Sequence, residues 1–142
     1  MVAKQLSVFI ENRKGRLGEV LSVLKNNNIN ILSLSLADTT EYGLLRLIVS
    51  DAKLSKEKLS EAGFSTILTD VLVVKISHET GSLQKLLDKL SEKDINIEYM
   101  YGLSVKEVNA FVVLKPSDLN KAQAIFDDFG VVTVSSEEIA NL

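Results

Sequence analysis

Residues 15–31 read GRLGEVLSVLKNNNINI, and residues 81–97, 66 positions later, read GSLQKLLDKLSEKDINI. Seven of these 17 aligned positions are identical, where composition alone would give about one. The chain therefore carries one structural unit twice, and no linker separates the copies. We predict two modules of roughly 70 residues, at 1–69 and 70–142. We expect them to pack as one unit, because a module of this size has a small core when it is alone.

Hydrophobic periodicity predicts the order strand, helix, strand, strand, helix, strand in the first copy. Alternation of apolar and polar residues predicts the strands, and apolar residues at i, i+3, i+4 and i+7 from Leu17 predict the first helix. Gly63 ends the second helix, and a hairpin turn is expected at 38–41. The predicted strands are 6–10, 30–37, 44–49 and 64–68, and the predicted helices are 17–24 and 54–62.

The second copy repeats this order. Its predicted strands are 72–76, 96–103, 108–114 and 131–134, and its predicted helices are 81–93 and 117–129. Ser135 and Glu138 have the spacing of a capping box, so a short terminal helix is also expected. The order is that of the split β-α-β unit of the α+β, ferredoxin-like βαββαβ fold, present twice. Each copy should form a four-stranded antiparallel sheet with two helices on one face.

Composition excludes several classes of function. Apolar residues make up 46% and charged residues 25% of the chain, as in a folded globular protein. The net charge of −3 disfavours nucleic-acid binding, which usually needs a basic surface. The chain has no cysteine and one histidine, which excludes disulfides, thiol catalysis, zinc–thiolate sites and a multi-histidine metal site within one chain. We predict no metal and no other cofactor.

The N-terminal residues lack the pattern of a signal peptide, and no apolar run is long enough to span a membrane. The expected location is therefore the cytoplasm, with no membrane partner.

The loop between the first predicted strand and helix carries the clearest chemical pattern. Gly15 permits a positive φ angle where the chain must turn sharply, and it allows a ligand to approach the backbone. The N–H groups of the helix start suit a carboxylate or phosphate. Asn12 offers a donor and an acceptor, and Arg13, Lys14 and Arg16 add positive charge. The same residues also fit a simple turn with a solvated basic surface, so this loop alone leaves ligand binding open.

The pattern Glu-Asn-Arg-x-Gly-x-Leu at 11–17, followed by a helix and by Asn-Ile-Asn-Ile at 28–31, resembles the signature of the ACT domain. ACT domains are small regulatory modules that commonly bind amino acids. The resemblance is close to the ACT domains of phosphoglycerate dehydrogenases that sense serine. The resemblance covers essentially the whole chain, once per copy.

This resemblance implies a ligand held between two side-by-side ACT modules. Asn12 matches the loop asparagine that holds the ligand, and Asn30 matches the asparagine of the second strand at the interface. Ile10 stands where the serine-sensing relatives have a histidine, which implies another ligand or another binding mode. The ligand-binding residues predicted in the first copy are Asn12, Arg13, Gly15, Arg16, Leu17, Asn30 and Ile31.

The loop of the second copy differs in charge. His78, Glu79 and Ser82 take the positions of Asn12, Arg13 and Arg16. We therefore expect one better site, at the first loop, rather than two equal sites. His78 remains a candidate ligand group, and the alternative for it is an exposed loop histidine.

Asn96, Tyr99 and Tyr101 are further candidates in the second copy, because Asn96 corresponds to Asn30 and the tyrosines follow it on the same strand. The two tyrosines are two residues apart and share a strand face, where they suit a pocket wall or interface packing equally. Strand alternation puts Asn96 on the opposite face unless the strand bulges.

We predict a small-molecule-binding regulatory protein without enzymatic activity. It binds a free amino acid between its two ACT domains and acts in trans on a partner enzyme or regulator. The mechanism is allosteric, because a ligand that bridges two modules favours one packing of them. Edge strands available for pairing between chains suggest a homodimer.

Three alternatives use the same topology. In an acylphosphatase-like hydrolase, Arg13 or Arg16 would hold a phosphate and Asn30 would place water, although the glycine-rich loop of those enzymes is missing. RNA-recognition motifs need aromatic residues on the central strands, and the segments 45–49 and 111–114 supply only Phe111. A protein-interaction module without a ligand is not separated from the first prediction by sequence.

Overall fold

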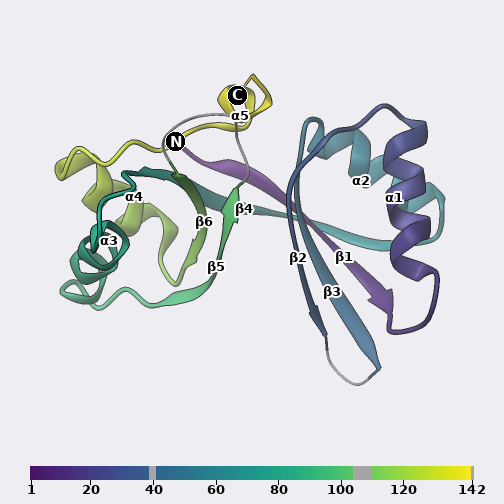
Figure 1. Cartoon of the computed structure of the whole chain (residues 1–142), viewed down its shortest axis with the longest axis horizontal. Coiled ribbons are helices and arrows are strands. Elements are labelled where there is room, and N and C mark those ends of the chain that lie inside the picture. The colour runs from purple at the N-terminus through teal and green to yellow at the C-terminus, as the bar shows by residue number, and fades with distance from the viewer. Residues whose placement is uncertain (39–40, 104–109, 142) are drawn as a thin grey trace. The chain divides into compact units, whose positions relative to one another are not determined.

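The computed structural model describes residues 1–38, 41–103 and 110–141. The chain divides into two compact units (Figure 1). The first unit is Lys4–Thr69, and the second unit is Asp70–Leu142 together with Met1–Ala3. Among the described residues, no helix is both long and apolar enough to cross a membrane.

The first unit follows the predicted order of strands and helices. Its strands are hydrogen-bonded in the order β2-β3-β1-β4, and the β1–β3 and β2–β3 pairs are antiparallel. This order and the helix positions confirm the ferredoxin-like α+β fold. The elements are β1 (Ala3–Glu11), α1 (Arg16–Asn26), β2 (Ile31–Asp38), β3 (Tyr42–Val49), α2 (Ala52–Glu61) and β4 (Ser65–Ile76), whose second half belongs to the second unit.

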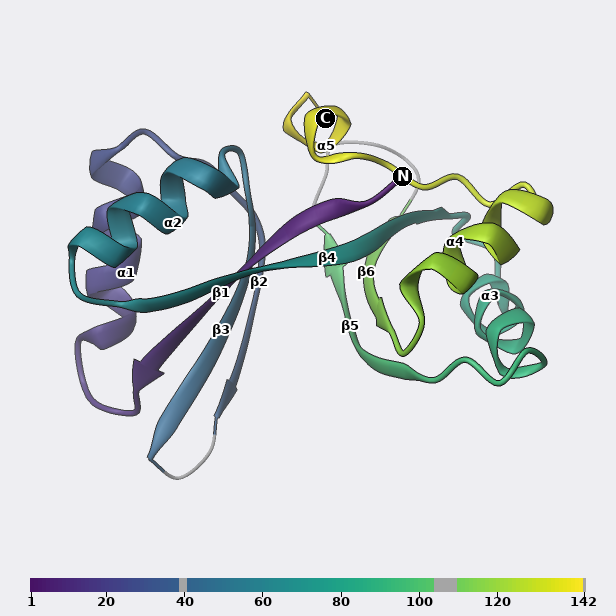
Figure 2. The same cartoon turned by 180° about the vertical axis from the view of Figure 1, so that it is seen from behind.

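Both helices of the first unit lie on the same face of its sheet (Figures 1 and 2). Alternate residues of β1, among them Leu6 and Val8, point toward the helices and are fully buried. Val20 and Leu24 of α1 pack against them from the other side of the core. The apolar stripe of the helix therefore faces the apolar side of the sheet, as the sequence pattern predicts.

The second unit repeats the arrangement with a reduced sheet. Its strands are hydrogen-bonded in the order β4-β6-β5, and α3 and α4 share one core with them. The short helix α5 confirms the predicted terminal helix, since the side chain of Ser135 caps it by accepting from the N–H of Glu138 at 3.2 Å. The elements are α3 (Ser82–Ser91), β5 (Ile97–Leu103), β6 (Ala110–Pro116), α4 (Leu119–Asp128) and α5 (Ser136–Ala140).

The predicted strand at 131–134 is wrong as a full strand. The segment makes a single antiparallel bridge between Thr133 and Val74, with one backbone hydrogen bond on each side of it. The reason lies in the next residue, because Ser135 already caps α5 and leaves too few residues for a longer ladder.

The strands predicted at 64–68 and 72–76 are extended in the structure, but they are joined into the single 12-residue strand β4. Thr69 and Asp70 include neither proline nor glycine, so nothing interrupts the extended chain between the copies. The predicted turn at 38–41 includes residues 39 and 40, and the predicted strand at 108–114 includes residues 108 and 109. These four positions lie outside the described residues.

The helices that follow the first strand of each repeat begin differently from the other helices. Gly15 and Gly81 stand at the N-caps of α1 and α3 in the left-handed conformation, with φ of 89° and 84°, and no side chain caps either helix. A residue with a Cβ atom adopts this conformation only with strain. The remaining helices are capped by the side chains of Asp51, Asp118 and Ser135.

Two glycines three residues apart should respond to alanine in opposite directions. Neither Gly15 nor Gly18 has an atom within 4 Å of an added Cβ, so only the backbone conformation differs between them. Gly15→Ala should lower the free energy of unfolding by about 1 kcal/mol, because its φ is positive. Gly18→Ala should raise it by about 0.5–1 kcal/mol, because Gly18 is inside a helix. Urea unfolding measures both changes, and two changes of the same sign would contradict this account.

Candidate functional site

A hollow of about 280 Å³ opens beside the first strand–helix loop of the first unit. It lies where the end of β1, the start of α1 and the β2–β3 hairpin meet. Apolar residues form its walls, and a charged pair and an amide form its polar side. The lining residues are Ile10, Glu11, Asn12, Arg13, Leu17, Leu36 and Gly43. We call this the loop hollow.

Backbone hydrogen bonds fix the loop against the hairpin. The N–H of Asn12 donates to the carbonyl oxygen of Glu41 at 2.9 Å, and the N–H of Arg13 donates to that of Glu11 at 2.8 Å. The carbonyl oxygen of Gly15 accepts from the N–H of Glu19 at 3.0 Å, which begins the helical ladder. Asn12 is therefore held at the rim of the loop hollow by its own backbone.

The two arginines of the loop have different roles. Arg13 lines the loop hollow, and its Nε lies 2.8 Å from Oε2 of Glu11, with both side chains more than half exposed. Arg16 does not line it. The Arg16 guanidinium pairs with Glu19 and lies over the ring of Phe64, 4.4 Å from the centroid. The buried Nε of Arg16 has no hydrogen-bond partner among the described residues. Arg16 therefore serves packing rather than the loop hollow.

The apolar walls bring together residues that are far apart in sequence. Ile10 is 5% exposed and stands two residues before Asn12. Leu36 and Gly43 also line the hollow, although sequence reasoning missed both. An added Cβ on Gly43 would lie 3.1 Å from Ile10 and 3.2 Å from Leu36. A glycine inside a predicted strand signals such a close approach, but it does not reveal which residues approach.

Asn30 and Ile31 line a different hollow, of about 250 Å³, at the other end of α1. The backbone of Asn30 is locked to Ser50, whose Oγ accepts from the Asn30 N–H at 2.9 Å and whose N–H donates to the Asn30 carbonyl at 2.9 Å. Its side-chain amide makes no hydrogen bond with the described part of the chain.

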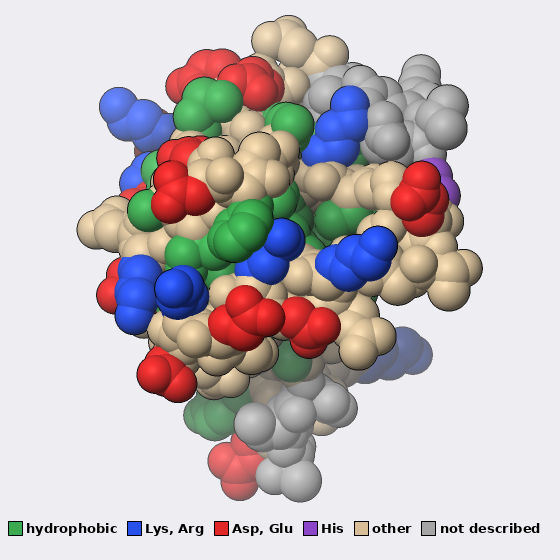
Figure 3. All heavy atoms as spheres, turned by 90° about the vertical axis from the view of Figure 1, so that its left-hand side faces the viewer, with side chains coloured by type: hydrophobic (Ala, Val, Ile, Leu, Met, Phe, Trp, Pro, Cys, Tyr) green, Lys and Arg blue, Asp and Glu red, His purple; other side chains and the backbone are tan. Residues whose placement is uncertain are grey.

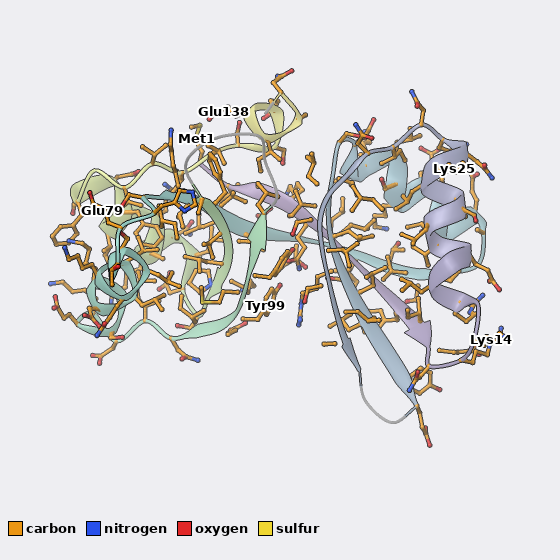
Figure 4. All side chains as sticks on the ribbon, in the orientation of Figure 1. Met1, Lys14, Lys25, Glu79, Tyr99 and Glu138 are labelled. Atoms are coloured by element: carbon orange, nitrogen blue, oxygen red, sulfur yellow. The ribbon has the colours of Figure 1, made fainter. Side chains whose placement is uncertain are left out.

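The two asparagines of the first unit cannot meet one small ligand. The 11-residue helix α1 separates them, and a helix of that length spans about 16 Å. Figure 4 shows this separation through Lys14 and Lys25, which lie at opposite ends of α1. A site that contains both a loop asparagine like Asn12 and a second-strand asparagine like Asn30 therefore needs two modules.

The candidate residues of the second unit lie in separate segments. His78 is exposed in the loop before α3. The N–H of Asn96 donates to Ser117 Oγ at 3.0 Å, which repeats the contact between Asn30 and Ser50. Tyr99 lies on β5 opposite Lys115, after a register shift between Ile97 and Tyr99. The shift interrupts the strand alternation between Asn96 and Tyr99, and whether the two residues line one wall stays a prediction.

Alanine substitutions of Arg13 and Arg16 should have different effects on the free energy of unfolding. Arg13→Ala should change the free energy of unfolding by less than about 0.5 kcal/mol, because its ion pair is exposed. Arg16→Ala should lower it by about 1 kcal/mol, because the side chain loses its contact with Phe64 and its packing. Chemical denaturation of both variants checks this, and equal effects would show that Arg16 is as loosely held as Arg13.

Comparison with known proteins identifies the family of this chain. The family described as ACT domain pair matches residues 1–142. The crystal structure of protein BT0572 from Bacteroides thetaiotaomicron is 37% identical, with a TM-score of 0.94 over 100% of this chain and 98% of that one. No curated protein matches this chain.

Two regulatory subunits of aspartate kinase share the fold. The subunit from Thermus thermophilus, in its ligand-free form, is 16% identical with a TM-score of 0.63, over 89% of this chain and 90% of that one. The subunit from Thermus flavus is 19% identical with a TM-score of 0.58, over 89% and 92%. The full-length family match and the duplicated ferredoxin-like fold show that this chain belongs to the ACT domain pair family, whose domains are of a regulatory type.

Proposed function

We propose that this ACT domain pair, with domains at 1–69 and 70–142, binds a free amino acid and regulates a cytoplasmic partner enzyme or regulator in trans. The observation that carries the proposal is the loop hollow, which lies at the family's loop motif and has Asn12 at its rim. Membership of the ACT domain pair family supports the ligand-binding, regulatory role.

The polar side of the loop hollow suits the two charges of a free amino acid. Arg13 and Glu11 present opposite charges 2.8 Å apart at the lining of the hollow. A zwitterion can exchange this exposed pair for two pairs of its own, with its carboxylate on Arg13 and its ammonium on Glu11. The first turn of α1 has no side-chain cap, so its N–H groups also favour the carboxylate.

The apolar side of the loop hollow favours an aliphatic side chain on the ligand. Ile10, Leu17 and Leu36 supply three branched aliphatic walls. A serine hydroxyl placed against them would lose its hydrogen bonds to water without gaining a partner, which costs free energy. The histidine that serine-sensing relatives use is absent, because Ile10 stands there. We therefore propose valine, leucine or isoleucine rather than serine.

Regulation would come from bridging two modules. Asn12 is at one end of α1 and Asn30 at the other, so a ligand on Asn12 would meet the second-strand asparagine of another module. In the proposed arrangement the two ACT domains of one chain form this pair, and Asn96 supplies that asparagine. A ligand that contacts both modules stabilises the packing in which both contacts are made. A partner that binds this packing in preference to others is then regulated in trans.

Thermal unfolding against the twenty amino acids tests the proposal. An aliphatic amino acid at 100 times its dissociation constant should add about 2.7 kcal/mol to the free energy of unfolding, or roughly 5–10 °C in Tm. Asn12→Ala should abolish the shift, and the matched Asn26→Ala, an exposed change at the end of α1, should keep it. If no amino acid shifts Tm, the chain is better described as a protein-interaction module without a ligand.

The same assay identifies which module supplies the second asparagine of the proposed site. Loss of the shift in Asn96→Ala but not in Asn30→Ala would support a site between the two domains of one chain. Loss in Asn30→Ala alone would place the second module in a partner chain, which contradicts the proposed pairing but keeps the amino-acid ligand.

We also propose a homodimer formed through the edge of β2. This strand is at one end of the strand order, and its Leu34 side chain is 49% exposed. Leu34→Lys should convert the dimer to a monomer, because lysine on an edge strand opposes pairing between chains. The control Ile67→Lys changes a side chain that is 50% exposed on β4 and should leave the dimer intact. Light scattering after size exclusion measures the mass, and a dimer in both variants would exclude this edge.

An acylphosphatase-like hydrolase has less support. Arg13 is paired with Glu11, Arg16 packs over Phe64, and Asn30 lines a separate hollow at the far end of α1. The residues needed to hold a phosphate and to place water are therefore not assembled within the first unit.

A further inference from the structure

A third hollow, of about 350 Å³, lies in the second unit beside α3. It is bounded by the end of β4, one side of α3 and the segment 130–132. Three lysines and one carboxylate, Glu79, are among its lining residues, and its floor is apolar. The lysines of the lining are Lys75, Lys85 and Lys89, and its apolar residues include Leu86, Val131 and Val132. We call it the lysine hollow.

The surface around α3 and α4 shows this combination of charge and apolar area. Figure 3 faces that side of the molecule, where Lys or Arg side chains lie beside a hydrophobic area, with Asp and Glu side chains among them. Lys89 is held in place, because its Nζ lies over the ring of Phe129, 3.7 Å from the centroid. At least one ammonium group is thus positioned by packing rather than extended into solvent.

Alignment of the two repeats shows which residues of the first unit correspond to those of the lysine hollow. The backbone hydrogen bond of Phe64 to Leu59 in the first unit recurs as that of Val131 to Phe126 in the second. Phe64 therefore corresponds to Val131. On the facing helix, the repeat aligns Arg16 with Ser82.

In the first unit, the protein fills the corresponding space itself. The Arg16 side chain lies over Phe64 and pairs with Glu19, so a cation, a ring and a carboxylate occupy the region. In the second unit, the smaller Ser82 and Val131 replace the arginine and the ring. This loss of volume leaves the lysine hollow open.

The charge in this region is reversed as well. The carboxylate of Glu19 is replaced by Lys85, and the apolar Val23 by Lys89. Both lysines lie on α3 and line the hollow. The Ser82 hydroxyl, 2.7 Å from that of Ser77, adds a hydrogen-bonding group at the same end. Where the first unit provides its own anion, the second unit provides cations and space for an anion from outside.

We propose that the lysine hollow binds a small organic anion with two negative charges, either a dicarboxylate or a phosphate monoester. One anionic group would take the position near Lys85 and the serine hydroxyls, and the other would face Lys89. The carbon skeleton would cover Leu86, Val131 and Val132. Charge-assisted hydrogen bonds to lysine are strong enough to select such a ligand over a neutral one. This ligand is distinct from the amino acid proposed for the loop hollow.

Chemical-shift titration of the ¹⁵N-labelled full chain tests the proposal. The probes are succinate and glycerol 3-phosphate, with glycerol as the neutral control and sodium chloride to match ionic strength. One anion should give saturating shifts at the amides of 82–86 and 130–132, and glycerol should give none. Saturation by succinate identifies a carboxylate site, and saturation by glycerol 3-phosphate a phosphate site. Shifts that rise linearly for both anions would overturn the proposal.

Substitution of Lys85 and Lys89 tests whether these lysines bind the anion. Lys85→Gln with Lys89→Gln should weaken binding about tenfold or more, because two charged hydrogen-bond donors are lost. Lys53→Gln with Lys56→Gln removes the same charge from α2 in the first unit and should leave affinity unchanged. Equal weakening in both pairs would show that only net charge matters and would overturn the site.

A second variant rebuilds the first unit's arrangement. Ser82→Arg with Lys85→Glu and Val131→Phe restores the arginine, carboxylate and ring, and it should abolish binding while the spectrum of 4–69 is preserved. Undiminished binding would overturn the proposal. These titrations are read at 82–86 and 130–132, whereas the amino-acid assay depends on Asn12. Failure of one proposal is therefore distinguishable from failure of the other.

Discussion

The loop hollow lies at a turn that depends on a glycine with positive φ between a strand and a helix. Gly15 and Gly81 turn the chain sharply into α1 and α3 and leave both helices without a side-chain cap. The turn sets the loop before each helix at the end of the sheet, where the loop hollow of the first unit lies. A residue with a Cβ atom would strain this turn. The backbone requirement at one position in each repeat thus decides where ligand chemistry can be placed.

Duplication kept this backbone while the side chains around it diverged. In the first repeat, Arg16 packs over Phe64 and fills the space beside the helix, and the loop hollow lies elsewhere, at the strand–helix loop. In the second repeat, Ser82 and Val131 leave the corresponding space open, and Lys85 and Lys89 line it. The two repeats therefore share this turn but differ in the hollows beside their helices. A regulatory protein that responds to two ligands can arise from such a pair without any change of fold.

The structure agreed with the sequence prediction where the signal was local and periodic. The stripe from Leu17 to Leu24 gave α1, and the capping spacing at Ser135 gave α5. The errors came where neighbours decide the outcome. The chain runs through Thr69 and Asp70 as one strand, which lies between β1 and β6 in the strand order. The segment at 131–134 has strand-forming residues but makes only one bridge, since α5 begins directly after it.

By itself, the sequence determined a duplicated α+β chain, its ferredoxin-like order and its membership of the ACT family. Periodicity, glycine positions and repeated motifs are properties of neighbouring residues, so they can be read along the chain. Only the tertiary structure decided which residues share a hollow. Leu36 and Gly43 line the same hollow as Asn12, whereas Asn30 lies at the opposite end of α1. Arg16 packs over the ring of Phe64. These outcomes depend on hairpin register and helix length, which fix distances between residues that are far apart in sequence.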